Sequence, residues 1–250
     1  LQRYNHKPLV IHAKLLDAVV RWVQRNLIDL KYQHFAQKGN GVVGISDAAF
    51  KKEDEEATAM RGCVILRTAS DAQRFTAISA STAIACHVLE FASKKQRHVT
   101  RSTFAEELFG CCDSIDTLLV VILALHEIET GTLDAARARR LRECGPYCYN
   151  TFVAVDAMSV FAAITAAFAK APAERSLISH VQWVREMLDH RVLSALLWVD
   201  TRDMHSSGLT KGKVARELLH QLMSGRYALL HPLKPWSSTQ RREMAELLGR

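Results

Sequence analysis

The chain has 250 residues, a formal net charge of +7, a pI near 9.2 and 48% hydrophobic residues, which indicates a globular protein with a sizeable core. It has no uninterrupted apolar run of the roughly 18 residues that a membrane span requires, and its first residues, LQRYNHKPLV, lack the features of a signal peptide. We therefore expect a soluble intracellular protein with no membrane partner. Because the chain does not begin with methionine, we also expect a piece of a longer product.

The positive charge is concentrated in two segments, SKKQRHVTR at 93–101 and ARARRLR at 136–142. Such clusters favour phosphate-rich partners, although a basic surface also serves solubility alone. The six cysteines are expected to be free thiols, because no second cysteine pair stands at zinc-ligand spacing with a histidine to complete four ligands.

In the first half of the chain, apolar residues at helical spacing predict an amphipathic helix over 9–27, followed by a loop at 37–41. The run VVGISDAAF predicts a strand that ends near Asp47. A charged connector at 51–62 then leads to two more strands, CVILRTA and FTAISASTAIACHVLEFAS. The connections are too short for helical crossovers, so these strands should be antiparallel.

The second half alternates helices and strands. A long buried helix is predicted from Ser102, its cap, through Thr130, and 131–150 reads as a helix end and loop. The later elements are predicted in chain order as a strand at TFVAVDAM, helices at VFAAITAAFAK and from Pro172 through SLISHVQWVREMLDH, a last strand at ALLWVDT and a last helix at VARELLHQLMSG. Together they predict a mixed α/β domain.

Three acids, Asp47, Glu107 and Asp156, fall where a predicted strand stops or a helix begins. Carboxylates brought together at one edge of a sheet repel each other unless cations neutralise them, and Mg²⁺ prefers such oxygen ligands. A pair of these ions about 4 Å apart suits phosphodiester hydrolysis. Spacing alone favours a structural interpretation instead, in which the same acids are helix caps or surface charges.

Five segments in order carry a family resemblance: ISDAAF at 45–50, MRGCVI at 60–65, FASKKQ at 91–96, STFAEEL at 102–108 and VAVDAM at 153–158. Together they resemble the ribonuclease H region of a copia-type LTR-retrotransposon Pol polyprotein. The family's usual tryptophan is replaced here by Phe91, and the asparagine after its third aspartate by Ala157. His180 is a weaker match to a family histidine.

The resemblance implies a ribonuclease H-like mixed sheet, with three antiparallel strands followed by parallel strands and flanked by helices. It implies that Asp47, Glu107 and Asp156 are catalytic and hold two Mg²⁺ or Mn²⁺ ions. The implied reaction hydrolyses the RNA strand of an RNA:DNA hybrid and leaves a 3′-hydroxyl. The candidates for contact with the nucleic-acid backbone are basic residues that could equally belong to a solvated loop: Lys94, Lys95, Arg97 and Arg101.

Upstream, Pro8, His12, RWV at 21–23 and LKY at 30–32 resemble the tail of the polymerase thumb and connection. The resemblance therefore divides the chain into a helical tail of that region at 1–38, a ribonuclease H-like domain at 39–225 and a C-terminal tail at 226–250. It implies the rest of the polyprotein as a partner, and a location in a cytoplasmic particle and in the nucleus.

One departure from the family concerns a metal ligand. The family ends in T-x-D-x-x-A-D-x-L-T-K, where the second aspartate is the fourth ligand, whereas TRDMHSSGLTK at 201–211 has Ser207 at that position. The pattern assigns Asp203 to the place of an earlier family acid, which leaves it at most a minor role. His205 is expected to be a surface histidine rather than a ligand or proton shuttle.

Three functions remain open from the sequence. The first is a hydrolase whose metal affinity is reduced by the loss of the fourth carboxylate, because serine is a neutral ligand. The second is a catalytically inactive remnant that still binds nucleic acid. The third is a scaffold in which the helices at 9–27 and 104–128 serve a partner subunit.

Overall fold

The structure is a computed structural model that describes residues 9–27, 29–35, 41–50, 59–69, 83–96, 100, 102–168, 172, 174–211, 216–239 and 243. The chain divides into two compact units, Leu1–Leu30 and Lys31–Arg250. The predicted loop at 37–40 and the first part of the third predicted strand, FTAISAST, lie outside the described residues.

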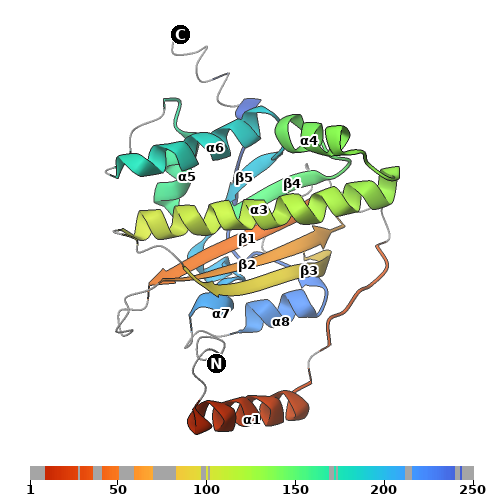
Figure 1. Cartoon of the computed structure of the whole chain (residues 1–250), viewed down its shortest axis with the longest axis vertical. Coiled ribbons are helices and arrows are strands. Elements are labelled where there is room, and N and C mark those ends of the chain that lie inside the picture. Colours follow the sequence, from red (N-terminus) through yellow and green to blue (C-terminus); the bar gives the residue numbers. More distant parts are fainter. Residues whose placement is uncertain are drawn as a thin grey trace. The chain divides into compact units, whose positions relative to one another are not determined.

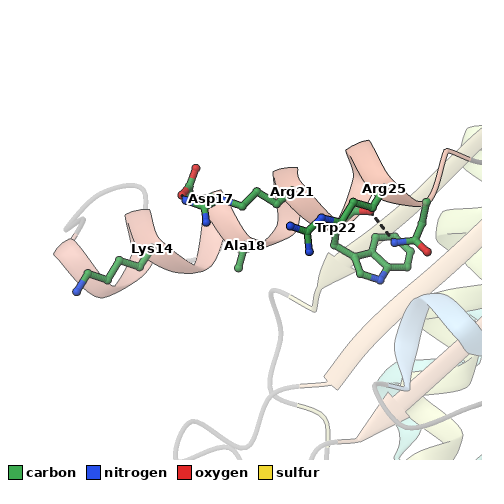
Figure 2. Close-up of a pocket in the computed structure, with 7 residues that line it drawn as sticks. Lys14, Asp17, Ala18, Arg21, Trp22 and Arg25 are labelled. Atoms are coloured by element: carbon green, nitrogen blue, oxygen red, sulfur yellow. Dashed lines mark hydrogen bonds and ion pairs between the residues drawn. The ribbon is translucent and has the colours of Figure 1, made fainter.

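The first unit contains α1, Val10–Arg25, at the place predicted for an amphipathic helix. None of its residues is buried within the protein. A hollow along this helix is lined by charged and aromatic side chains, shown in Figure 2, and the Arg21 guanidinium pairs with Asp17 at 2.5 Å.

The second unit is built on a sheet of seven strands within the described residues, in the order β6-β3-β2-β1-β4-β5-β7 (Figure 1). Their bounds are β1 Gly41–Phe50, β2 Ala59–Thr68, β3 Ile84–Lys95, β4 Asn150–Val155, β5 Ala195–Trp198, β6 Arg226–Tyr227 and β7 Lys234–Trp236. Strands β1, β2 and β3 pair antiparallel, whereas β4 and β5 join β1 in parallel. The mixed α/β class is confirmed, and the mixed sheet flanked by helices is consistent with a ribonuclease H-like fold.

Helices cover both faces of the sheet. Their bounds are α3 Thr103–Thr130, α4 Ala135–Cys144, α5 Met158–Thr165, α6 Ile178–Asp189, α7 Ser207–Thr210 and α8 Glu217–Met223. One core cluster joins α3, α5 and α6 to one face of the sheet, and a second lies on the other face under α8 and the segment before α7 (Figure 1). Within β1 the side chains alternate, so that Val42 belongs to the first cluster and Val43 and Ile45 to the second.

Helix α3 is the central helix of the first cluster. Ser102 caps it as predicted, since its hydroxyl accepts a hydrogen bond from the backbone N–H of Ala105. By length and composition alone it is the one helix of the described residues that could cross a membrane, with 44% of its most apolar window buried inside the protein. Its contacts with β1 and β2 are those of a core helix.

Several sequence predictions need correction. Strand β1 does not end near Asp47 but continues to Phe50, and β2 begins at Ala59, inside the predicted connector. The segment 131–150 contains α4, which Asp134 caps; none of its residues is buried, so no apolar stripe marked it in the sequence. The strand at 195–198 is not the last, because β7 pairs with it and β6 pairs with β3. None of the six cysteines forms a disulfide, as predicted.

Candidate metal centre

Two of the three predicted acids are placed by strand register. Ile45 of β1 pairs in parallel with Ala154 of β4. Asp47 lies two residues beyond Ile45, and Asp156 lies two residues beyond Ala154. Because side chains alternate along a strand, both acids point to the same face of the sheet from neighbouring strands. The parallel register therefore brings together two residues that are 109 positions apart in sequence (156 minus 47).

The third acid comes from the second turn of α3. Gly110 lets this helix approach β1 closely, since a Cβ at Gly110 would lie 3.3 Å from Ser46 Oγ and 3.5 Å from the Ala48 Cβ. The preceding turn carries Glu107, whose Oε2 accepts a hydrogen bond of 3.2 Å from the backbone N–H of Ala48. The contact fixes the Glu107 carboxylate beside Asp47.

The three acids form one cluster, in which one carboxylate oxygen from each of Asp47, Glu107 and Asp156 lies within 4.8 Å of the others. Asp47 is fully buried. Burial raises the pKa of Glu107 to about 8, and the carboxylates of Asp156 and Asp47 raise it as well. Burial and the Asp47 charge also raise the pKa of Asp156. Negative charge in this cluster is costly without a cation.

The donor set suits a hard divalent cation. Three carboxylates at this separation offer only oxygen ligands, the type that Mg²⁺ and Mn²⁺ prefer, and the raised pKa values reflect burial of neighbouring acids. The residues that would hold such an ion are Asp47, Glu107 and Asp156.

The raised pKa of Glu107 predicts how the stability of the metal-free protein depends on pH. The folded protein keeps a proton on Glu107 up to about pH 8, whereas the unfolded chain releases it near the ordinary value of 4.5. The free energy of unfolding should therefore fall as the pH rises between these values, and Mn²⁺ should offset the loss. Urea unfolding in EDTA at pH 5 and pH 8 measures this, and Glu107→Gln should weaken the pH dependence. A wild-type stability that rises over this window would contradict the assignment.

Ser207, which was predicted to replace a fourth acidic ligand, is the first residue of α7 and is 9% exposed. The end of this short helix reaches Asp47: the Thr210 hydroxyl donates to Asp47 Oδ2, and Lys211 Nζ lies 3.2 Å from Asp47 Oδ1. Lys211 Nζ also lies 3.3 Å from Ser207 Oγ. Sequence reasoning used Thr210 and Lys211 only as motif matches, and nothing in their spacing indicated contact with Asp47.

A glycine allows α7 to come this close. Gly62 of β2 pairs with Asp47, and a Cβ at Gly62 would lie 2.8 Å from Thr210 Cγ2 and 3.2 Å from the Ser206 carbonyl oxygen. Because a side chain at residue 62 would press against the Ser206 backbone, a residue larger than glycine would push α7 away from β2.

We therefore expect Gly62→Ala to lower the free energy of unfolding by about 1–2 kcal/mol, as for overpacked sites, and to separate Thr210 and Lys211 from Asp47. Urea unfolding gives the stability change, and Mn²⁺ titration reports on the site. Gly131→Ala is a useful comparison because its Cβ would meet nothing within 4 Å, although its φ of +92° adds backbone strain of its own. Unchanged stability and Mn²⁺ affinity in Gly62→Ala would show that α7 tolerates the displacement.

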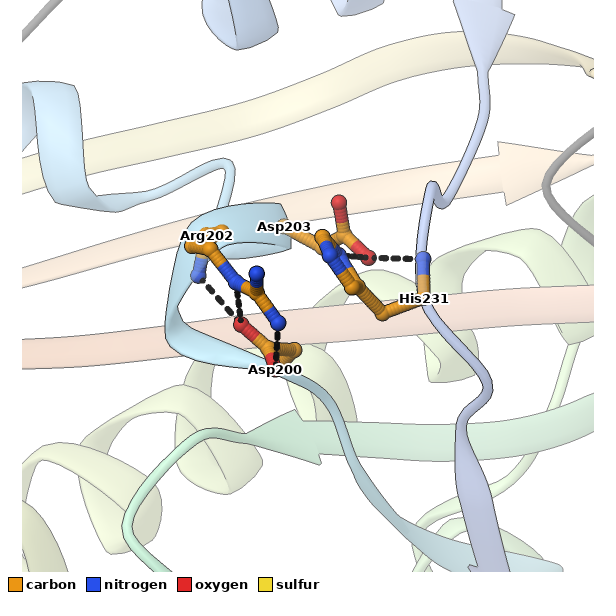
Figure 3. A network of polar contacts seen from close by, with 4 residues as sticks. All are labelled: Asp200, Arg202, Asp203 and His231. Carbon is orange, nitrogen blue, oxygen red and sulfur yellow. Dashed lines mark hydrogen bonds and ion pairs between the residues drawn. The ribbon is translucent and has the colours of Figure 1, made fainter.

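The neighbouring polar residues of the same segment lie in the second core. Asp203 is 1% exposed, and its Oδ2 accepts a hydrogen bond of 2.7 Å from the backbone N–H of His231 and contacts His231 Nδ1 at 3.1 Å (Figure 3). His205 was predicted at the surface, but it is 1% exposed and its ring lies 4.9 Å from that of Tyr227. Burial lowers the pKa of His205 to about 4. The apolar neighbours Met204 and Tyr227 bury this histidine, which the polar sequence around it did not indicate.

The Arg202 side chain forms an exposed ion pair with Asp200, in which Arg202 Nε lies 2.8 Å from Asp200 Oδ1 (Figure 3). The Asp203–His231 contact ties the segment before α7 to the chain that follows β6. Neither Asp200 nor Asp203 belongs to the acidic cluster found among the described residues.

The predicted basic contacts are only partly described. Lys94 is exposed and Lys95 half-buried on β3, whereas Arg97 and Arg101 lie outside the described residues. A groove of about 600 Å³ runs between β2, β3, α3 and α6. It is lined by Arg61, Lys94, Phe109, Cys112, Asp113, Asp116, His180 and Trp183. The groove follows α3, the helix that also carries Glu107. Sequence reasoning missed Arg61 and Trp183, which no motif marked.

Comparisons with known proteins give distant structural matches only among solved structures. No protein-family model matches the sequence, and no curated protein matches it. Among solved structures, the N-terminal ribonuclease H domain of Rv2228c from Mycobacterium tuberculosis, solved as a fusion with maltose-binding protein, is similar at 15% identity and a TM-score of 0.38. The match covers 73% of this chain and 98% of that one. A functional assignment therefore rests on the residues of the site.

Proposed function

We propose that this chain is a divalent-metal-dependent nuclease that hydrolyses the RNA strand of RNA:DNA hybrids. The observation that carries the proposal is the convergence of Asp47, Glu107 and Asp156 within 4.8 Å, from two parallel strands and a helix. Isolated caps or surface acids need not meet, whereas a metal-dependent phosphodiesterase requires such a cluster.

Each acid has a role in holding and orienting the substrate's reacting phosphate. Two bound Mg²⁺ or Mn²⁺ ions would supply the charge that stabilises the attacking and leaving oxygens of the phosphodiester. Asp47, the fully buried member of the cluster, would be one of the three carboxylate ligands. The Ala48 N–H that holds Glu107 keeps this carboxylate aimed at the centre of the cluster, so that little reorganisation is needed at the moment of reaction.

The groove along α3 supports a nucleic-acid substrate. Lys94 and Arg61 place positive charge along it, and Trp183 provides an aromatic surface for a base or sugar. Asp113, which pairs with Arg61, and Asp116 also line the groove, so contact with a phosphate backbone would depend on the exposed Lys94. Recognition of the RNA strand would depend on its 2′-hydroxyls, which line the wide minor groove of the hybrid.

The direct test offers the protein a hybrid labelled on its RNA strand, with Mg²⁺ or Mn²⁺, and compares single-stranded RNA, duplex RNA and duplex DNA. We expect cleavage of the hybrid alone, with 3′-hydroxyl ends, and none in EDTA. Cleavage of every substrate would overturn the hybrid specificity. Binding of the hybrid without cleavage in either metal would remove the enzymatic function.

We further propose that the domain derives from the Pol polyprotein of a copia-type retrotransposon, with the remaining polyprotein as a partner and a cytoplasmic particle and the nucleus as locations. The support is the chain order of the motifs that contain Asp47, Glu107 and Asp156. Detection of a longer product that joins this segment to polymerase sequence would test it, and a transcript that encodes this segment beside unrelated domains would contradict it.

A second candidate is a nucleic-acid-binding remnant without catalysis. It is favoured by one observation, the neutral Ser207 with Lys211 already beside Asp47, since both weaken the attraction of the cluster for metal. Under this alternative the hybrid binds with an affinity that falls steeply with salt, and no cleavage occurs.

A further inference from the structure

Both carboxylate oxygens of Asp47 are already engaged by one short segment. Oδ2 accepts from the Thr210 hydroxyl, and Oδ1 accepts from Lys211 Nζ at 3.2 Å. A metal ion needs at least one of these oxygens. Each oxygen keeps a further lone pair, but a divalent cation bound to Asp47 would lie close to the Lys211 ammonium group, and the repulsion between the two cations favours displacement of the lysine.

Lys211 acts on the whole cluster. It contacts Asp47 directly. Its positive charge also lowers the pKa of Glu107 and of Asp156, although burial raises both pKa values by more. Among the ion pairs given for the described residues, the one that involves an acid of the cluster is Lys211 with Asp47. The ammonium group thus supplies positive charge at the place where a metal ion would supply it.

The serine at 207 makes room for this arrangement. Ser207 Oγ lies 3.3 Å from Lys211 Nζ, so a neutral hydroxyl rather than a fourth carboxylate faces the ammonium group. With a carboxylate there, the lysine would have a second acid to pair with. With serine, its ionic partner on this side is Asp47.

Lys211 also has a route out of the site. It follows the last residue of α7, and its side chain is 38% exposed, whereas the Asp47 side chain is 0% exposed. A flexible four-carbon side chain can turn into water without breaking any backbone hydrogen bond. Displacement of the lysine is therefore feasible while the fold remains intact.

We propose that Lys211 is a tethered counter-cation that neutralises the acidic cluster in the metal-free protein and must leave Asp47 when a divalent ion binds. This inference rests on the proposed function only in taking Asp47, Glu107 and Asp156 as the metal site. It adds that the lysine stabilises the metal-free fold and lowers metal affinity, because binding must displace it.

The test measures Mn²⁺ binding by calorimetry, and thermal unfolding in EDTA and in Mn²⁺, for wild type and Lys211→Met. Methionine keeps the length of the side chain and removes its charge. Lys14→Met, on the exposed face of α1, is the control with the same change in net charge. We expect Lys211→Met to unfold at a lower temperature than wild type in EDTA, to bind Mn²⁺ about 10-fold more tightly, and to gain more stability from Mn²⁺. Lys14→Met should behave like wild type.

The proposal is overturned if Lys211→Met binds Mn²⁺ with wild-type or weaker affinity, or if Lys14→Met shows the same increase in Mn²⁺ affinity as Lys211→Met. It is also overturned if neither wild type nor Lys211→Met binds Mn²⁺. A Lys211→Met protein that unfolds in EDTA but refolds in Mn²⁺ would support it, since the metal then replaces the lost charge. Hybrid cleavage is measured separately. If the Mn²⁺ affinity rises in Lys211→Met but the wild-type protein cleaves no hybrid, the nuclease function is refuted and the counter-cation role of Lys211 is supported.

Discussion

Asp47→Asn is expected to lower hybrid cleavage by at least about 100-fold and to weaken Mn²⁺ binding by a similar factor. Changes to residues that only support metal ligands cost about 10- to 100-fold. Asp47 would be a ligand itself: it is the fully buried member of the cluster and lies beside the other two acids. It also contacts Thr210 and Lys211. Asparagine keeps the shape of the side chain but removes the charge that binds the ion. Cleavage rates under single-turnover conditions and Mn²⁺ calorimetry give the two factors.

The matched control for this change is Asp17→Asn on α1, where the carboxylate is exposed and pairs only with Arg21 within its own helix. It should keep wild-type cleavage and metal affinity. Circular dichroism of Asp47→Asn should match that of wild type, because backbone pairing between β1 and β4, rather than the Asp47 charge, sets the strand register. Wild-type cleavage by a folded Asp47→Asn protein would place the catalytic site elsewhere.

Ser207→Asp is expected to tighten Mn²⁺ binding by at least about 10-fold, because it adds a fourth carboxylate beside the cluster. The gain should be limited by Lys211, whose Nζ lies 3.3 Å from Ser207 Oγ and would pair with the new acid. In the double variant Ser207→Asp, Lys211→Met the gain should therefore be larger than in Ser207→Asp alone. Mn²⁺ calorimetry of the four proteins measures this coupling as a double-mutant cycle.

Ser179→Asp provides the control, since it adds the same charge at an exposed position on α6. It should leave the Mn²⁺ affinity within about twofold of wild type, as expected for a solvent-screened charge at an exposed position. If Ser207→Asp behaves like Ser179→Asp, residue 207 does not face the ion, and the correspondence with the family's fourth ligand is wrong.

The sequence by itself determined the mixed α/β class and the identity of the three acids. Hydrophobic patterns with periods of two and of about 3.6 residues are local properties, which is why α1, α3 and β4 were predicted close to their observed bounds. Element ends were less certain: β1 extends three residues beyond Asp47, because pairing of Phe50 with Ala59 prolongs both strands. Helix α4 was missed because an exposed basic helix has no apolar stripe.

Only the tertiary structure decided what surrounds the acids. The parallel register of β1 and β4, the close approach of α3 at Gly110 and the passage of α7 over Gly62 depend on contacts between residues far apart in sequence. These contacts buried His205, which had been expected at the surface, and placed Lys211 against Asp47. A motif states which side chains are present, but the charge that each one experiences depends on distance and burial, and both are set by packing across the sheet.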